Sequence, residues 1–142
     1  MASGSTPLRI AAVVACAAAV YLTSLCAAAF TAAQADRGLR AYERSCAKCH
    51  QSDLQGNQEV EAPALAGNAF MSRWKGQPIK DLFEKVSTKM PADQPGSLPT
   101  GTYLDIVAYL LQANRFPAGS DELSANGESL AQVIAETART DR

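Results

Sequence analysis

Apolar side chains recur at steps of three and four residues along several stretches of this chain, which is the pattern of amphipathic helices. The pattern predicts helices over residues 36–47, 68–76, 78–90 and 102–114, and a shorter final helix near the C-terminus. Leu130, Val133 and Ile134 form the narrow apolar stripe of that final helix. No βαβ pattern accompanies them.

The helices over residues 36–47 and 102–114 are expected to pack against each other. One face of the first carries Gly38, Leu39, Tyr42 and Cys46, and the facing stripe of the other carries Leu104, Val107, Ala108 and Leu111. Glycine costs about 1 kcal/mol in a helix interior. Gly38 therefore either lies in the first helical turn or allows a partner helix to approach closely, with Tyr109 and Leu110 near Gly38 and Tyr42.

The central part of the chain is expected to form two shorter helices between loops. Asn68 is the expected N-cap of the first, and Gly76 ends it. Pro78 suits the first turn of the second, whose inward stripe is Ile79, Leu82, Phe83 and Val86. Residues 51–62 are polar and glycine-containing, and residues 90–96 hold two prolines and a glycine, so both are expected to be loops.

Residues 1–35 have the composition of an export signal. Arg9 precedes an uncharged apolar run over residues 10–30, and Ala33-Gln34-Ala35 has the small-x-small form that signal peptidase recognises. The expected mature chain begins at Asp36. An uncleaved membrane anchor stays open because the run is long enough to span a bilayer. Lipidation at Cys16 is a third alternative, with few apolar residues before it.

Removing 35 of the 142 residues leaves 107, which is the size of one compact domain. Loss of Arg9 leaves 12 basic against 14 acidic side chains, a balance that gives no indication of nucleic-acid binding. All five lysines lie between residues 48 and 89. Scattered charges usually form a solvated face, but Lys48 and Lys89 could instead surround a redox site and attract an acidic partner.

The segment Cys46-Ala47-Lys48-Cys49-His50 has the spacing of a covalent attachment site for a c-type haem. The two cysteines can add to the vinyl groups as thioethers, and His50 then offers an imidazole nitrogen as the fifth iron ligand. We expect one haem c, bound through Cys46 and Cys49. Export is consistent with this, because bacteria attach such haems outside the cytoplasmic membrane.

Paired cysteines have two other common uses. A thioredoxin-like dithiol has no use for the adjoining histidine and is typical of a βαβ context. A structural zinc ion needs four ligands, and the other cysteines, Cys16 and Cys26, lie in the predicted signal. With both removed, the mature chain has no disulfide framework, so the core and the cofactor would have to stabilise it.

The sixth iron position could be taken by a methionine, a lysine or water, or remain open, because His50 is the single histidine of the chain. Met90 is the preferred candidate, since it lies in a proline-stiffened loop with little helical core to join. Met71 is the alternative, but its neighbours Phe70 and Trp74 favour core packing.

The residues then resemble a known family. Gly38, Tyr42, Cys46, Cys49-His50, Pro63, Met90-Pro91 and the segment Tyr103-Leu104-Asp105-Ile106-Val107-Ala108-Tyr109-Leu110 resemble the class I c-type cytochromes over nearly the whole predicted mature chain. The resemblance implies a small all-α fold with crossed N- and C-terminal helices around one haem. It also implies that the Pro63 carbonyl accepts a hydrogen bond from His50, and that Trp74 or Arg73 reaches a haem propionate.

A narrower resemblance covers Pro63-x-Leu65-x-Gly67, Phe70, Trp74, Met90-Pro91 and residues 116–119, which look like the cytochromes that accompany quinoprotein alcohol dehydrogenases. It implies a periplasmic one-electron carrier that takes electrons from such a dehydrogenase and passes them to an oxidase or another cytochrome, without being an enzyme itself. The alternative is a haem enzyme or gas sensor with an open sixth site. The expected organisation is a signal over 1–35, a cytochrome domain over 36–115 and an extension over 116–142 that packs on it.

Overall fold

The computed structural model describes residues 29–135, which form helices joined by loops. The α-helices are α1 (Ala32–Ser45), α2 (Ala47–His50), α3 (Gly67–Trp74), α4 (Ile79–Lys89) and α5 (Thr100–Ala113), and two 3-10 turns cover Gln58–Val60 and Glu128–Ala131. The described residues form no β-strand beyond two isolated bridges. The predicted all-α class is therefore confirmed, and it is the class of the small class I cytochrome c fold.

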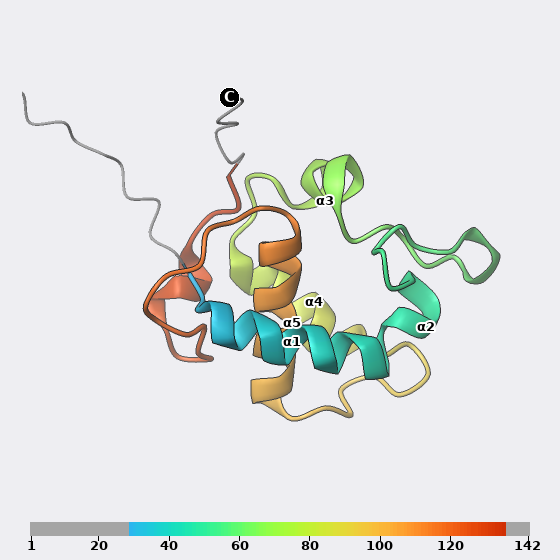
Figure 1. Cartoon of the computed structure of the whole chain (residues 1–142), viewed down its shortest axis with the longest axis horizontal. Coiled ribbons are helices and arrows are strands. Elements are labelled where there is room, and N and C mark those ends of the chain that lie inside the picture. The colour runs from blue at the N-terminus through green and yellow to red at the C-terminus, as the bar shows by residue number, and fades with distance from the viewer. Residues whose placement is uncertain (1–28, 136–142) are drawn as a thin grey trace, which may run out of the picture.

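Helix α1 crosses α5 at close range (Figure 1). Gly38 lies at the crossing, beside Asp105 and Tyr109 of α5. A Cβ atom at position 38 would collide with the backbone carbonyl of Asp105 and lie 2.8 Å from the Cβ of Tyr109. The rings of Tyr42 and Tyr109 pack beside it, with centroids 5.3 Å apart. Of the two roles expected for Gly38, the structure therefore shows the close approach of a partner helix.

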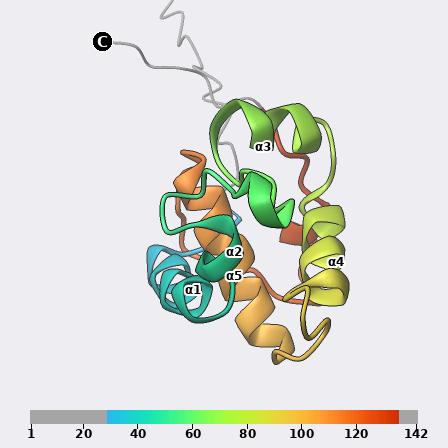
Figure 2. The same cartoon turned by 90° about the vertical axis from the view of Figure 1, so that its right-hand side faces the viewer.

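Helix α5 is the centre of the core. Seven of its side chains are buried, namely Tyr103, Leu104, Ile106, Val107, Ala108, Leu110 and Leu111. Viewed from the side, α1 lies on one flank of α5 and α4 on the other (Figure 2). The buried surface of α5 is therefore wider than the single apolar stripe predicted from the sequence, because helices pack against α5 from two directions.

The fold begins before the predicted mature start. Helix α1 starts at Ala32, where the Thr31 hydroxyl accepts a hydrogen bond from the Gln34 amide (3.1 Å). Phe30 is 1% exposed and Ala35 is fully buried. The predicted boundary after Ala35 therefore lies inside a helix and not at the edge of the folded domain.

The rest of the predicted export segment, residues 1–28, lies outside the described residues, as do Cys16 and Cys26. The proposals of an apolar anchor and of lipidation at Cys16 fall on that same part of the chain. Within residues 29–135, no helix has the length and apolar character needed to cross a membrane.

The described part of the C-terminal extension, residues 116–135, packs along the domain. The Gln34 side chain is paired with the backbone of Leu123 through two hydrogen bonds, of 3.0 and 2.8 Å. The Gly119 amide donates to the Phe30 carbonyl (2.7 Å). This extension therefore holds the start of α1, and residues 136–142 lie outside the described part.

The predicted final helix is wrong. Residues 132–134 run as an extended segment beside the start of α4, where the Ile79 amide donates to Gln132 (2.9 Å) and the Gly76 amide to Ile134 (2.8 Å). Backbone hydrogen bonds between residues 132–134 and residues 76–79 therefore replace the hydrogen bonds of a helix. As a result Val133 is 57% exposed, whereas Leu130 and Ile134 are buried.

Three smaller expectations differ from the structure. Ala66 is the N-cap of α3 instead of Asn68, because Gly67 already has helical bonding although its φ is positive. Pro78 is the N-cap residue of α4 and not part of its first turn. Leu39 is 36% exposed, so it lies at the edge of the face that Gly38 and Tyr42 present to α5.

Replacing Gly38 by alanine is expected to destabilise the protein by about 3 kcal/mol or more, because the added methyl group must push the backbones of α1 and α5 apart. Urea unfolding of the haem-loaded protein measures the change. Gly101→Ala is the matched control, since Gly101 is also helical but nothing lies within 4 Å of its added Cβ. The free energy of unfolding of Gly101→Ala is expected to rise by up to about 1 kcal/mol. Equal losses of stability in Gly38→Ala and Gly101→Ala would contradict the close crossing.

Candidate functional site

A cavity of about 500 Å³ lies between the end of α1, α2, α4 and α5. This volume is within the range of sites that hold cofactors, roughly 300–1,000 Å³. Apolar side chains make up much of its wall, among them Leu65, Trp74, Leu82, Val86, Ile106 and Leu110. The cavity is therefore suited to a large and mostly apolar group with a few polar attachment points.

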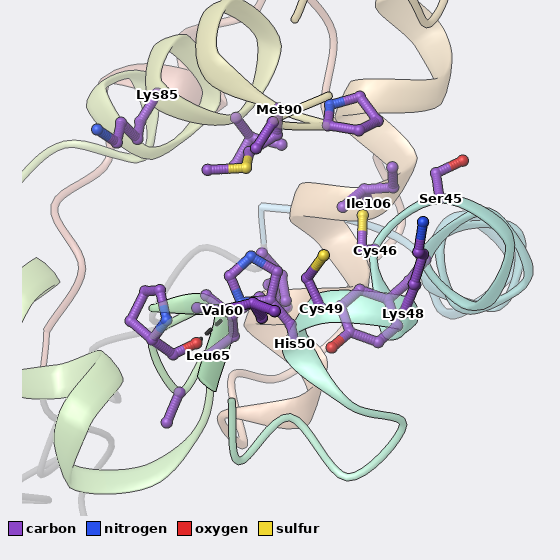
Figure 3. A pocket seen from close by; sticks show the side chains of 18 of the residues that line it. Ser45, Cys46, Lys48, Cys49, His50, Val60, Leu65, Lys85, Met90 and Ile106 are labelled. Atoms are coloured by element: carbon purple, nitrogen blue, oxygen red, sulfur yellow. Dashed lines mark hydrogen bonds between the residues drawn. The ribbon is translucent and has the colours of Figure 1, made fainter. Parts of the chain in front are cut away.

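The short helix α2 brings Cys46, Cys49 and His50 to one side of the cavity (Figure 3). Helix α1 ends where the Cys46 amide donates to the Tyr42 carbonyl (2.8 Å), and the chain bends there. The Cys46 carbonyl then accepts from the amides of Cys49 (3.1 Å) and His50 (2.9 Å). One helical turn therefore directs both sulfurs and the imidazole into the same space.

The imidazole of His50 is buried, with 7% of the residue exposed. Its Nδ1 lies 2.8 Å from the carbonyl oxygen of Pro63. A carbonyl can only accept, so this contact requires the proton on Nδ1, and in the neutral imidazole the lone pair is then on Nε2. In Figure 3 that second nitrogen faces across the cavity. The contact between His50 and Pro63 that the family resemblance implied is thus present, and the other ring nitrogen faces the cavity.

Hydrogen bonds hold the segment that carries Pro63 against the haem motif. The Leu65 amide donates to the Leu54 carbonyl (2.8 Å), and the Gly56 amide donates to the His50 carbonyl (3.0 Å). These two bonds connect residues 54–56 to both sides of the His50–Pro63 contact. The loop over residues 51–62 therefore helps to position the Pro63 carbonyl beside the His50 imidazole.

Asn114, at the C-terminal end of α5, is a site-supporting residue that sequence reasoning missed. Its side-chain nitrogen donates to the carbonyls of Leu65 (2.9 Å) and Leu110 (2.8 Å), and its oxygen accepts from the Gly67 amide (2.9 Å). Asn114 thus anchors the chain just after Pro63 to the central helix. An asparagine at a helix end is usually a cap, so no local signal indicated this contact.

Met90 ends α4 and lines the cavity, with its sulfur on the side opposite His50 (Figure 3). Its amide donates to the Val86 carbonyl (3.1 Å), the last helical bond of α4. Met71, the alternative candidate, is absent from the cavity wall and packs against the hydrophobic core. The structure therefore brings Met90, and not Met71, to face the imidazole.

Charged side chains also border the cavity. Lys48, Lys85 and Arg73 line it, together with Glu61 and Asp93. Trp74 is among the lining residues as well, so both residues suggested for a propionate contact border the cavity. Lys89, which was expected to border the site, is exposed and does not line the cavity. Lys85 on α4 borders the cavity instead (Figure 3).

The thiol environment differs from that of a redox dithiol. Burial, and secondarily the neighbouring Cys49, raises the pKa of Cys46 to about 11. Reactive Cys-x-x-Cys pairs have lowered thiol pKa values instead. Over residues 29–135, no three His, Cys, Asp or Glu side chains are grouped as metal ligands, so the zinc alternative gains no support either.

The residues fit a haem c. Two sulfurs and one imidazole lie on one side of an apolar cavity, a thioether lies on the other, and cationic side chains lie at its border. Cys46 and Cys49 would hold the group covalently, with His50 as the first axial ligand and Met90 as the residue placed for the second. The apolar wall would exclude water from the iron.

Asn114→Ala is expected to destabilise the haem-loaded protein by about 2–4 kcal/mol, because it leaves the Leu65 carbonyl and the Gly67 amide without their partner in a mostly buried place. Urea unfolding measures the loss. Gln112→Ala, on the exposed side of the same helix, is expected to change stability by less than about 0.5 kcal/mol. Indistinguishable losses would show that Asn114 does not anchor this segment.

Comparison with known proteins gives one match. No curated protein and no solved structure matches the chain. A family model matches residues 33–110, more than half of the chain, and its description is cytochrome c oxidase, cbb3-type, subunit III. The match covers the haem motif, Met90 and most of α5. By this match, with the cavity described above, the chain belongs to the family of cbb3-type cytochrome c oxidase subunit III, a family of c-type cytochrome domains.

Proposed function

We propose that the protein is a periplasmic one-electron carrier whose haem c is bound by His50 and Met90. Membership of a cytochrome c family already makes it a haem c electron-transfer protein. The observation that carries the finer proposal is the placement of two ligands across one cavity. His50 has its Nδ1 proton engaged by Pro63 (2.8 Å), and the sulfur of Met90 lies opposite.

This ligand pair is suited to electron transfer and not to catalysis. When bound, the haem supplies an iron that alternates between the ferric and ferrous states. A thioether ligand and an apolar cavity both favour the less charged ferrous state and so raise the reduction potential. His50 and Met90 together leave no axial position for oxygen or a substrate. The chain would then carry charge between partners and catalyse no reaction alone.

The axial ligand is tested by two methionine variants. Met90→Ala is expected to lose the long-wavelength ferric absorption band of thioether ligation and to bind carbon monoxide rapidly in the ferrous state. Met71→Ala is the matched control, since Met71 is half-buried but does not line the cavity, and it is expected to keep the band. The reverse result would assign the ligand to Met71, and a wild type with a high-spin spectrum would favour the enzyme or sensor.

The partners we propose are other redox proteins of the same compartment. The donor is a quinoprotein-type dehydrogenase, as the narrower sequence resemblance suggests, and the acceptor is a terminal oxidase or another cytochrome. We base the proposed docking on three cationic side chains at the cavity border, which would attract an acidic surface on a partner: Lys48, Lys85 and Arg73. Their attraction would act mainly on the association rate and would weaken as salt is raised.

For export, we propose cleavage before Phe30, earlier in the chain than the pattern at Ala33-Gln34-Ala35 suggested. Phe30 is 1% exposed and its carbonyl accepts from Gly119 (2.7 Å), while Gln34 pairs with Leu123. Removing both residues would take a packed aromatic ring and a buried amide pair from the domain. The sequence Ala27-Ala28-Ala29 also has the small-x-small form.

Intact mass and N-terminal sequencing of the exported protein test this site, with a chain that begins at Phe30 as the expected result. Ala27→Asp is expected to block the cut, because signal peptidase requires a small residue at that position. Ala33→Asp, at the corresponding place of the later pattern and on the exposed side of α1, is expected to leave it unchanged. A start at Asp36 would contradict the earlier cut, and a retained Met1 would contradict a cleaved signal.

A further inference from the structure

Tyr103 contacts the loop that carries Met90. This tyrosine lies in the first turn of α5 and is 3% exposed. Its hydroxyl donates to the carbonyl oxygen of Met90 (2.7 Å) and accepts from the amide of Leu98 (3.2 Å). One buried hydroxyl therefore connects the two ends of the loop over residues 90–98 and ties both of them to the central helix.

The Met90 amide also donates to the Val86 carbonyl of α4 (3.1 Å), and the other hydrogen bonds described for this loop are local to it. The Gln94 amide donates to Pro91 (3.0 Å), the Ser97 amide to Gln94 (3.2 Å) and the Gly96 amide to the Met90 carbonyl (3.2 Å). Such turns shape the loop but do not determine where it lies relative to the cavity. The Tyr103 hydroxyl adds a tie to a second element, because it reaches the loop from a helix that also forms the cavity wall through Ile106 and Leu110.

We propose that Tyr103 is a positioning residue for the thioether of Met90 and that its hydroxyl keeps the sixth iron position closed. The inference rests on the proposed ligation by Met90. A methionine side chain has three rotatable bonds and adapts easily, so the location of its sulfur depends on how firmly its backbone is held. Without the hydroxyl, the Leu98 amide loses its partner, the Met90 carbonyl keeps only Gly96, and the loop can move away from the cavity.

Tyr103→Phe separates this role from simple core packing, because it removes the hydroxyl and keeps the buried ring. Two tyrosines provide matched controls. The Tyr42 hydroxyl also donates to a backbone carbonyl, that of Gln51 (2.6 Å), but on the side of His50. Tyr109 lies on the same helix as Tyr103, and its ring packs on Tyr42, not on the Met90 loop.

The experiment is a spectrophotometric titration of the ferric, haem-loaded proteins with imidazole, which competes for the sixth position. Tyr103→Phe is expected to bind imidazole about five- to tenfold more tightly than wild type, the change that corresponds to the loss of a buried hydrogen bond. Its ferric thioether band should weaken as well. The imidazole affinities of Tyr42→Phe and Tyr109→Phe are expected to stay within about twofold of wild type. Met90→Ala gives the upper limit of the imidazole affinity.

Each remaining outcome overturns the inference in a distinguishable way. Unchanged imidazole affinity in Tyr103→Phe, with lower resistance to urea, would mean that the hydroxyl stabilises the fold without holding Met90. An equal rise in Tyr42→Phe would mean a general loosening of the domain. If Met90→Ala itself binds imidazole no more tightly than wild type, Met90 is not the ligand, and the proposed ligation fails together with the role of Tyr103.

Discussion

The close crossing of α1 and α5 at Gly38 is the contact on which the rest of the structure depends. The missing side chain lets the backbones approach until position 38 reaches the Asp105 carbonyl. Helix α1 therefore ends at a defined place beside α5, and the Cys46–His50 turn begins at that end. Any increase in the distance between these helices would move both cysteines and the histidine together, because they follow α1 without an intervening loop.

Helix α5 also determines where the two axial candidates lie. At its N-terminal end, Tyr103 holds the Met90 carbonyl (2.7 Å), and at its C-terminal end Asn114 holds Leu65 (2.9 Å), two residues after the acceptor of His50. Between them, Ile106 and Leu110 form part of the cavity wall. A single helix thus contacts the backbone on both sides of the site.

The start of α1 is held by the extension that follows α5. The extension after α5 returns to the start of α1, where Gln34 pairs with Leu123 and Arg37 binds both Asp105 (3.0 Å) and Glu122 (2.9 Å). The pair with Glu122 is exposed and the pair with Asp105 is partly buried, and ion pairs near the surface contribute little alone. The buried amide pair and Phe30 supply most of the attachment. A domain this small gains core from such a segment, because its central helices by themselves leave the outer end of α1 uncovered.

The sequence by itself determined the features that depend on neighbouring residues. Cys46, Cys49 and His50 were identified because covalent attachment and ligation require fixed local spacing, and the helical periods of α4 and α5 follow from amphipathic packing. Met90 could be preferred over Met71 from its proline-rich surroundings alone. Gly38 was recognised as unusual, but two explanations remained until its partner helix was seen.

Only the tertiary structure decided the contacts between distant segments. The support of Met90 by Tyr103, the support of residues 65 and 67 by Asn114, and the inclusion of residues 30–35 in the fold have no local sequence pattern. The final segment carried an apolar stripe at helical spacing, yet it pairs its backbone with residues 76–79. Periodicity reports which residues prefer burial. Which backbone groups then bond depends on the neighbour that burial brings beside them.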